Sequence, residues 1–163
     1  MTKFFTSMLL AVVLAGNLQI ANAHSFKAGE LTINHPYATP SLNGSKTGAM
    51  YIRGIQNTGK QADQLISART PMAERVELHQ MQMDNNVMKM RAVPAIELPA
   101  QAELRMMHGS ADGYHLMLIN LKQPLKDGDR FSVWLQFKNS GEREVTVHVQ
   151  TPKNSAPAHD HHH

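Results

Sequence analysis

Two histidines and two methionines of this chain stand at spacings that would let them share a metal ion. His115 and Met117 lie two residues apart in the segment GYHLML, so on a β-strand both side chains leave the same face. His79 lies in the segment VELHQMQM and Met90 in the returning segment VMKMR, with a DNN turn between them. This order predicts a hairpin, across which His79 can approach a methionine. If the two elements are neighbours, the four side chains form a cage of two imidazoles and two thioethers.

The donor types in this cage favour monovalent copper. Thioether sulfur is a poor ligand for Zn²⁺, Mg²⁺ and Ca²⁺, whereas it binds soft Cu(I) well. Neutral imidazole binds Cu(I) too, and a methionine sulfur is not protonated when the pH falls. The chain has 11 Met, 10 His and no Cys, so no thiolate would hold the metal. Such a donor set suits a carrier that must release copper as well as bind it.

Methionine is also a common core residue, and the sequence leaves other roles open for the remaining candidates. Packing is the favoured role for Met50, Met72, Met106 and Met107, and a surface or capping role for His35 and His148. The sequence does not decide whether His108, Met81, Met83 or Met88 takes part in binding.

Length and composition exclude several classes of protein. The 163 residues fit one ordinary domain. The absence of Cys excludes disulfides, a thiolate zinc site, a Cys nucleophile and a cysteine-ligated blue-copper centre for electron transfer. The net charge of +3 is scattered along the chain and aromatic residues make up only 6%, so no nucleic-acid partner is expected.

Residues 1–23 have the pattern of a secretory signal peptide. Lys3 supplies a positive start, residues 8–15 are apolar, and Ala21-Asn22-Ala23 is a typical cleavage site. The apolar stretch is too short to span a bilayer, although an uncleaved membrane anchor is the alternative. We expect a periplasmic protein that begins at His24 and does not insert stably into the membrane.

The rest of the chain predicts an all-β fold. Residues 131–138 and 144–149 alternate between apolar and polar types, as strands with one buried face do. Further strands are expected at 31–35, 48–55, 63–68, 75–79, 87–93, 103–107 and 115–121. Nine short strands with turns between them favour a Greek-key β-sandwich or barrel over residues 24–152. Residues 153–163 read as a flexible His-rich tail.

Several segments together resemble the periplasmic copper chaperones called PCu(A)C, a family with a cupredoxin-like β-sandwich. They are AHSFKAGELTI from Ala23, HPYA from His35, GAMY from Gly48, VELH from Val76, VMKMR from Val87, GYHLML from Gly113 and LKQPLKDGD from Leu121. The resemblance implies Cu(I) transport rather than catalysis. It also implies delivery to the CuA centre in subunit II of cytochrome c oxidase, directly or with a Sco-type thiol protein.

The family's ligand pattern maps onto His79, Met90, His115 and Met117. Ten residues separate the first pair, as in the family, and His115-Leu116-Met117 matches the closing His-x-Met element. Two features depart from the pattern. The 24 residues between Met90 and His115 exceed the usual gap, which places an extra histidine, His108, near the expected site. Gln80 also stands where relatives often have a methionine.

The two ends of the exported chain suggest alternatives. A tail cluster could form a second, looser site for Cu(II), or could be the remnant of a purification tag. It contains His159, His161, His162 and His163. Cleavage before His24 would expose an N-terminal histidine that chelates Cu(II), so a copper-dependent enzyme with a histidine brace is the alternative function. A β-sandwich interaction module without metal is a third possibility.

Overall fold

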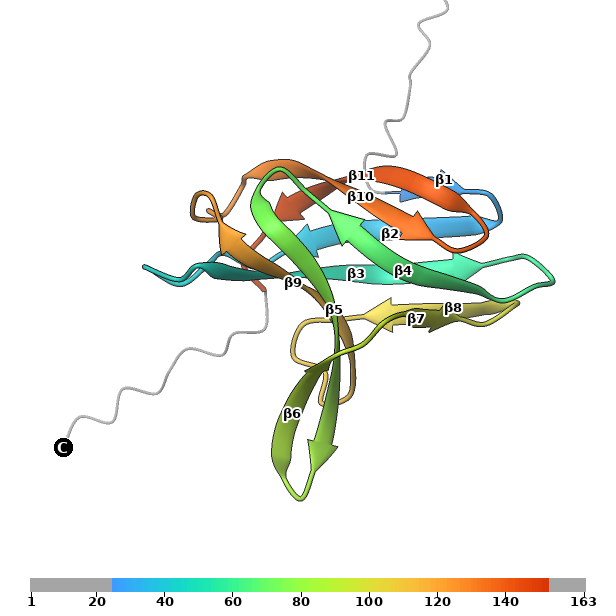
Figure 1. The fold of residues 1–163 in the computed structure, drawn as a ribbon, viewed down its shortest axis with the longest axis horizontal. Helices are drawn as coiled ribbons and strands as arrows, with labels where there is room; N and C mark the ends of the chain where they lie inside the picture. Colours follow the sequence, from blue (N-terminus) through green and yellow to red (C-terminus); the bar gives the residue numbers. More distant parts are fainter. Residues whose placement is uncertain (1–24, 153–163) are drawn as a thin grey trace, which may run out of the picture.

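The computed structural model describes residues 25–152, which form β-strands joined by turns (Figure 1). The strands are β1 (Ser25–Ala28), β2 (Leu31–Ala38), β3 (Thr47–Asn57), β4 (Asp63–Arg69), β5 (Ala73–Asp84), β6 (Val87–Ala92), β7 (Ile96–Leu98), β8 (Ala102–Met106), β9 (Gly113–Leu121), β10 (Arg130–Phe137) and β11 (Gly141–Val149). The all-β prediction is confirmed. The predicted leader, His24 and the tail histidines lie outside the described residues.

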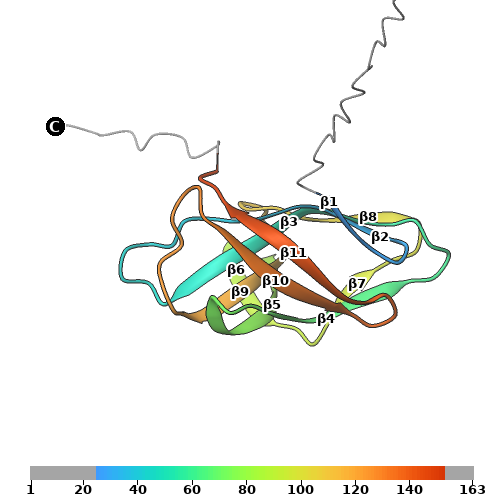
Figure 2. The same ribbon diagram turned by 90° about the horizontal axis from the view of Figure 1, so that it is seen from above.

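The strands join into one mixed sheet that curls around a shared core (Figures 1 and 2). Their order is β6-β5-β9-β3-β2-β11-β10-β4-β7, with β1 paired to β2 and β8 to β3. All pairs are antiparallel except β11 with β2. Strands that follow one another in the chain are therefore often apart in the sheet. For example, β9 lies between β5 and β3 and is not paired with β8 or β10. This crossing order brings the two expected site segments side by side.

Period-two alternation decides which side chains enter the core. Val133, Leu135 and Phe137 of β10 have no exposed surface, and neither do Leu116 and Leu118 of β9. Burying each of these apolar side chains contributes roughly 1.5–3 kcal/mol. On β9 the residues that alternate with the two leucines, His115 and Met117, must point to the opposite face of the sheet, so the core residues fix their direction.

Two strands were not expected from the sequence. β1 has four residues and β7 only three, which is too short for alternation to be read. Both are held by a neighbour, since β1 pairs along its whole length with β2 and β7 with the start of β4. Residues 25–152 contain no helix with the length and apolarity needed to cross a membrane.

The β5–β6 hairpin extends beyond the other strands (Figure 1). Its two-residue turn, Asn85-Asn86, has positive φ angles of 48° and 61°. These are the values of a type I′ turn, whose twist matches that of antiparallel strands and which asparagine tolerates. The predicted hairpin is therefore present, and its register is regular from His79 to Asp84.

Candidate metal site

The two histidines of the predicted cage are direct neighbours on adjacent strands. His79 on β5 is the Cα partner of His115 on β9. Cross-strand partners point to the same face of a sheet, and the two ring centroids lie 5.3 Å apart at an interplanar angle of 66°. The sheet thus brings together two imidazoles that have 35 residues between them in the chain.

The two methionines lie on the same face. Met117 is opposite Glu77 on β5, two residues from His79. Met90 is opposite Met81, which is two residues from His79 in the other direction. All four predicted ligands therefore share one face of the β6-β5-β9 part of the sheet, with Met90 displaced toward the tip of the hairpin.

A cavity of about 300 Å³ opens on this face. Its walls include three of the four candidates, namely Met90, His115 and Met117, and also Met81, Met88, Ala49, Tyr51 and residues 108–110. His79 is not among the wall residues, but its ring contacts that of His115. The cavity is consequently lined by sulfur atoms, aromatic rings and imidazoles rather than by carboxylates.

His115 is held neutral by its surroundings. Only 2% of the residue is exposed, and burial, with a smaller contribution from His79, lowers its pKa to about 4. Its Nδ1 is buried without a hydrogen-bond partner. Buried polar atoms are normally paired, so an orphaned imidazole nitrogen on a cavity wall is an available donor for a metal ion.

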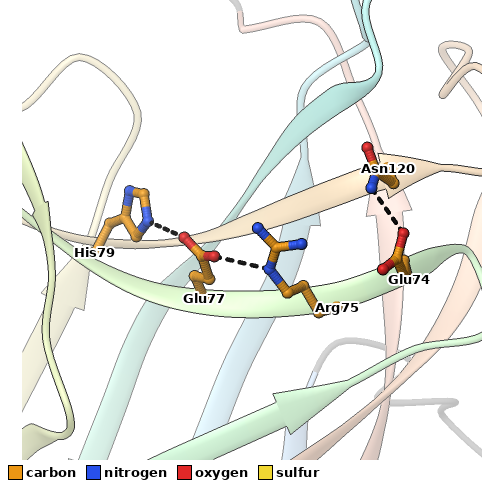
Figure 3. Close-up of polar contacts among 5 residues, drawn as sticks. All are labelled: Glu74, Arg75, Glu77, His79 and Asn120. Atoms are coloured by element: carbon orange, nitrogen blue, oxygen red, sulfur yellow. Dashed lines mark hydrogen bonds and ion pairs between the residues drawn. The ribbon is translucent and has the colours of Figure 1, made fainter.

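His79 is oriented by a carboxylate (Figure 3). Its Nε2 lies 2.9 Å from Oε2 of Glu77, and the other oxygen of Glu77 accepts a hydrogen bond of 2.9 Å from Arg75. These two hydrogen bonds lower the pKa of Glu77 and keep it ionised. The ionised carboxylate accepts a hydrogen bond from Nε2–H, so the lone pair of the neutral imidazole is on Nδ1, and this atom is buried without a partner. The arrangement matches the carboxylate–histidine pairs that commonly orient metal ligands.

Sequence reasoning missed Glu77 and Tyr51. The ring centroid of Tyr51 on β3 lies 6.0 Å from that of His115 and 5.4 Å from that of Tyr37. Burial and the neighbouring Tyr37 raise its pKa, so the hydroxyl keeps its proton. Alternation along β3 could have placed Tyr51 and Ala49 on one face, but only the pairing of β3 with β9 directs that face toward the cavity.

The extra histidine of the longer loop does reach this region. The backbone N–H of His108 donates to the hydroxyl of Tyr37 at 3.0 Å, and its ring stands edge-on to Tyr51 at 5.4 Å and 90°. His108 therefore lines the cavity beside His115. Within residues 25–152, no three His, Asp or Glu side chains are grouped so as to hold a metal ion.

Comparison with known proteins supplies the family. Residues 31–149 match the family described as putative lipoprotein LpqE-like. The chain belongs to this family. It is similar to a putative lipoprotein of Leifsonia xyli subsp. xyli, with 31% identity over 97 residues, which is 59% of this chain and 57% of the relative. The LpqE-like chain thus spans little more than half the length of that relative.

Solved structures share the fold. The copper-bound PCuAC domain from PmoF2 has a TM-score of 0.66 and 23% identity, covering 79% of this chain and 99% of that domain. Apo-DR1885 from Deinococcus radiodurans has a TM-score of 0.57 and 23% identity, covering 92% and 98%. The Cu(I) form of DR1885 has a TM-score of 0.56 and 26% identity, covering 82% and 85%. The LpqE-like chain therefore has the all-β fold of PCuAC domains.

Proposed function

We propose that this LpqE-like protein is a copper chaperone that binds Cu(I) through His79, Met90, His115 and Met117. The observation that carries the proposal is the pair of adjacent imidazoles, each with a buried Nδ1 that has no partner, on a face that also carries the two thioethers. The structural relatives support copper as the cargo, since they include a copper-bound PCuAC domain and a Cu(I) form of DR1885.

The unequal exposure of the four side chains supports a role in transfer. His115 is buried, whereas 56% of Met90 is exposed at the outer edge of the cavity. An incoming ligand from an acceptor protein reaches Met90 first. Because a thioether is a neutral and weak donor, its displacement needs no proton transfer. Copper then passes through an intermediate in which donor and acceptor each supply ligands, with no change of oxidation state.

The destination and compartment follow the same proposal. A signal peptide over residues 1–23 would send the protein to the periplasm, where the CuA domain of cytochrome c oxidase subunit II, or a Sco-type thiol protein, would receive the copper. Residues 24–152 would be the copper-binding domain and 153–163 a tail whose histidines, with His24, offer a Cu(II) site. The matching lipoprotein relatives support export. In this role the protein is a carrier and not an enzyme.

Competition for Cu(I) under anaerobic conditions tests the primary site. A chromophoric Cu(I) chelator is titrated against the wild type and the Met90→Ala and His115→Ala variants. Each variant should bind Cu(I) at least about tenfold more weakly, because each loses one of the four proposed donors. Met72→Ala is the matched control, since Met72 is a partly buried methionine that packs against the core instead. Unchanged affinity in both site variants would reject the assignment.

A further inference from the structure

The outer half of the β5–β6 hairpin carries more methionine than the primary site uses. Met81 and Met83 on β5 face Met90 and Met88 on β6 as direct cross-strand partners. We propose that Met81, Met83 and Met88 form a second Cu(I) site, built from thioethers alone, at the tip side of the cavity. This inference goes beyond the proposed function because it needs neither the histidines nor any particular acceptor.

The register places the methionine side chains as close together as a hairpin allows. In a two-residue type I′ hairpin the two residues that flank the turn form a hydrogen-bonded pair, and here these are Asp84 and Val87. Because hydrogen-bonded and non-hydrogen-bonded pairs alternate, the next pair, Met83 and Met88, is non-hydrogen-bonded. Accordingly the N–H of Met83 points away from β6 and donates to Oδ1 of Asp112 at 2.9 Å. Non-hydrogen-bonded partners have Cα atoms about 4.5 Å apart and the closest side chains.

The same reasoning applies two residues further along. The N–H of Val93 donates to the carbonyl of Leu78 at 2.8 Å, which fixes the alternation at the other end of the pairing. Met81 and Met90 therefore also form a non-hydrogen-bonded pair. The Cα atoms of the four methionines therefore stand at the corners of a patch roughly 5 Å by 7 Å. Methionine has three rotatable bonds, with which Met81, Met83 and Met88 can converge on one ion.

Hard ligands and cations are turned to the opposite face of the hairpin. Gln80, Gln82, Lys89 and Arg91 alternate with the methionines and pair among themselves in register. Arg91 donates to Gln80 at 3.0 Å, and Lys89 is ion-paired with Asp84. At the outer end of the hairpin the side chains of the methionine face are thus soft, neutral donors, which favour Cu(I) or its analogue Ag(I) over Zn²⁺.

Core packing does not account for these residues. This holds for Met83 and Met88, which are 45% and 46% exposed, whereas Met81 is buried, with 7% exposed. Exposed strand positions usually carry polar or β-branched side chains rather than methionine. Met88 and Met81 also line the cavity next to Met90. A Cu(I) ion held by the hairpin would consequently lie next to the primary site, because Met81 is two residues from His79 on β5 and opposite Met90 on β6.

Titration with Ag(I) in chloride-free buffer tests the second site, with the methyl groups of methionine followed by carbon-13 NMR. The methyl signals report each sulfur separately and do not respond to metal held by imidazoles elsewhere in the chain. The signals of Met81, Met83 and Met88 should shift together as one Ag(I) binds. Those of the buried Met50 and Met106 should stay in place. Static signals for Met83 and Met88 with up to three equivalents of Ag(I) would overturn the proposal.

Two double variants separate this site from the primary one. Met83→Leu with Met88→Leu keeps the apolar surface but removes both sulfurs, so it should lose one bound Ag(I) or Cu(I) and keep the other. His115→Ala with Met117→Leu should show the reverse, with the hairpin methyl shifts retained. If the leucine variant keeps the wild-type stoichiometry, the second site is refuted and the face instead serves another purpose, such as contact with a protein partner. If only the hairpin methyls respond in the wild type, the primary site fails and the second site stands.

Discussion

Glu77 determines which nitrogen of His79 is free. The carboxylate is ionised and bonded to Nε2, so Nδ1 keeps its lone pair and lies buried beside the ring of His115. Without this carboxylate the ring could flip or change tautomer and present an N–H to the metal. Glu77, which is not itself a proposed ligand, thereby leaves Nδ1 of His79 free to bind a metal ion.

This role predicts a specific loss of affinity. Glu77→Ala should weaken Cu(I) binding about 10- to 100-fold, the usual effect of removing a partner that orients a metal-ligating histidine. The control is Glu74→Ala, which removes a carboxylate from the same strand. Glu74 bonds to Asn120 at 2.7 Å and does not contact His79 (Figure 3). Anaerobic chelator competition gives the affinities; equal values for the two variants would show that Glu77 has no orienting role.

Residue types and spacing predicted the ligand candidates but not their partners. His115 and Met117 can be placed on one face from their spacing alone, because strand alternation is local. Glu77 and Tyr51 lie at the candidate site only because β5 and β3 pair with β9 in these particular registers. A local sequence pattern does not show how distant strands are paired. The same limit applied to His108, which the sequence placed near the site without deciding whether it takes part.

At the scale of elements, a buried carboxylate ties β4 to the turn between β10 and β11. Oδ1 of Asp63 accepts hydrogen bonds from the backbone N–H groups of Gln64 and Asn139, at 2.8 and 2.9 Å. Oδ2 accepts from the N–H and the hydroxyl of Ser140, at 3.0 and 2.7 Å. Burial alone would raise the pKa of Asp63, but these hydrogen bonds outweigh it and lower the pKa.

Substitution of this carboxylate should destabilise the fold without touching the metal site. Asp63→Asn replaces one accepting oxygen with an NH₂ group, which at the Oδ2 position would face the N–H and the hydroxyl of Ser140, both of them donors. We expect a loss of about 2–4 kcal/mol in the free energy of unfolding, measured by urea denaturation. Ser140→Ala, which removes a single hydroxyl donor, should cost only about 1 kcal/mol. A D63N protein as stable as the wild type would contradict this account.

The long alternating strands were predictable and the short ones were not. β10 and β11 follow the expected pattern because each has enough residues to repeat it, with one face in the core. β7 exists because its backbone pairs with β4 and because Ile96 and Leu98 fill the core. Both reasons are tertiary contacts, which three residues of sequence do not encode.

The whole molecule places the candidate site between a rigid body and a projecting hairpin. The curled sheet encloses the apolar core and holds His115 and Met117 on β9. The hairpin carries the exposed methionines outward (Figure 1). A buried imidazole at this junction must stay neutral, and that requirement couples the stability of the entire fold to pH.

The sign of this coupling follows from the direction of the shift. The pKa of His115 is about 4 in the folded protein, below the ordinary histidine value of 6.5, so between these values the unfolded chain binds a proton that the folded chain does not. Stability contributed by this group is therefore complete above pH 6.5 and decreases as the pH falls toward 4. From pH 7.5 to pH 5 the metal-free protein should lose about 2 kcal/mol through His115 alone.

Urea denaturation of the metal-free protein at pH 7.5, 6 and 5, followed by the fluorescence of the single Trp134, measures the effect. The His115→Leu variant is the comparison, because leucine fills the buried position but binds no proton. Its free energy of unfolding should fall less than that of the wild type over the same range, by the same 2 kcal/mol or so. Parallel losses in the two proteins would mean that His115 takes up a proton as readily when folded as when unfolded. In that case protons would compete with copper for the imidazole at acidic pH, and the buried position would confer no advantage on metal binding.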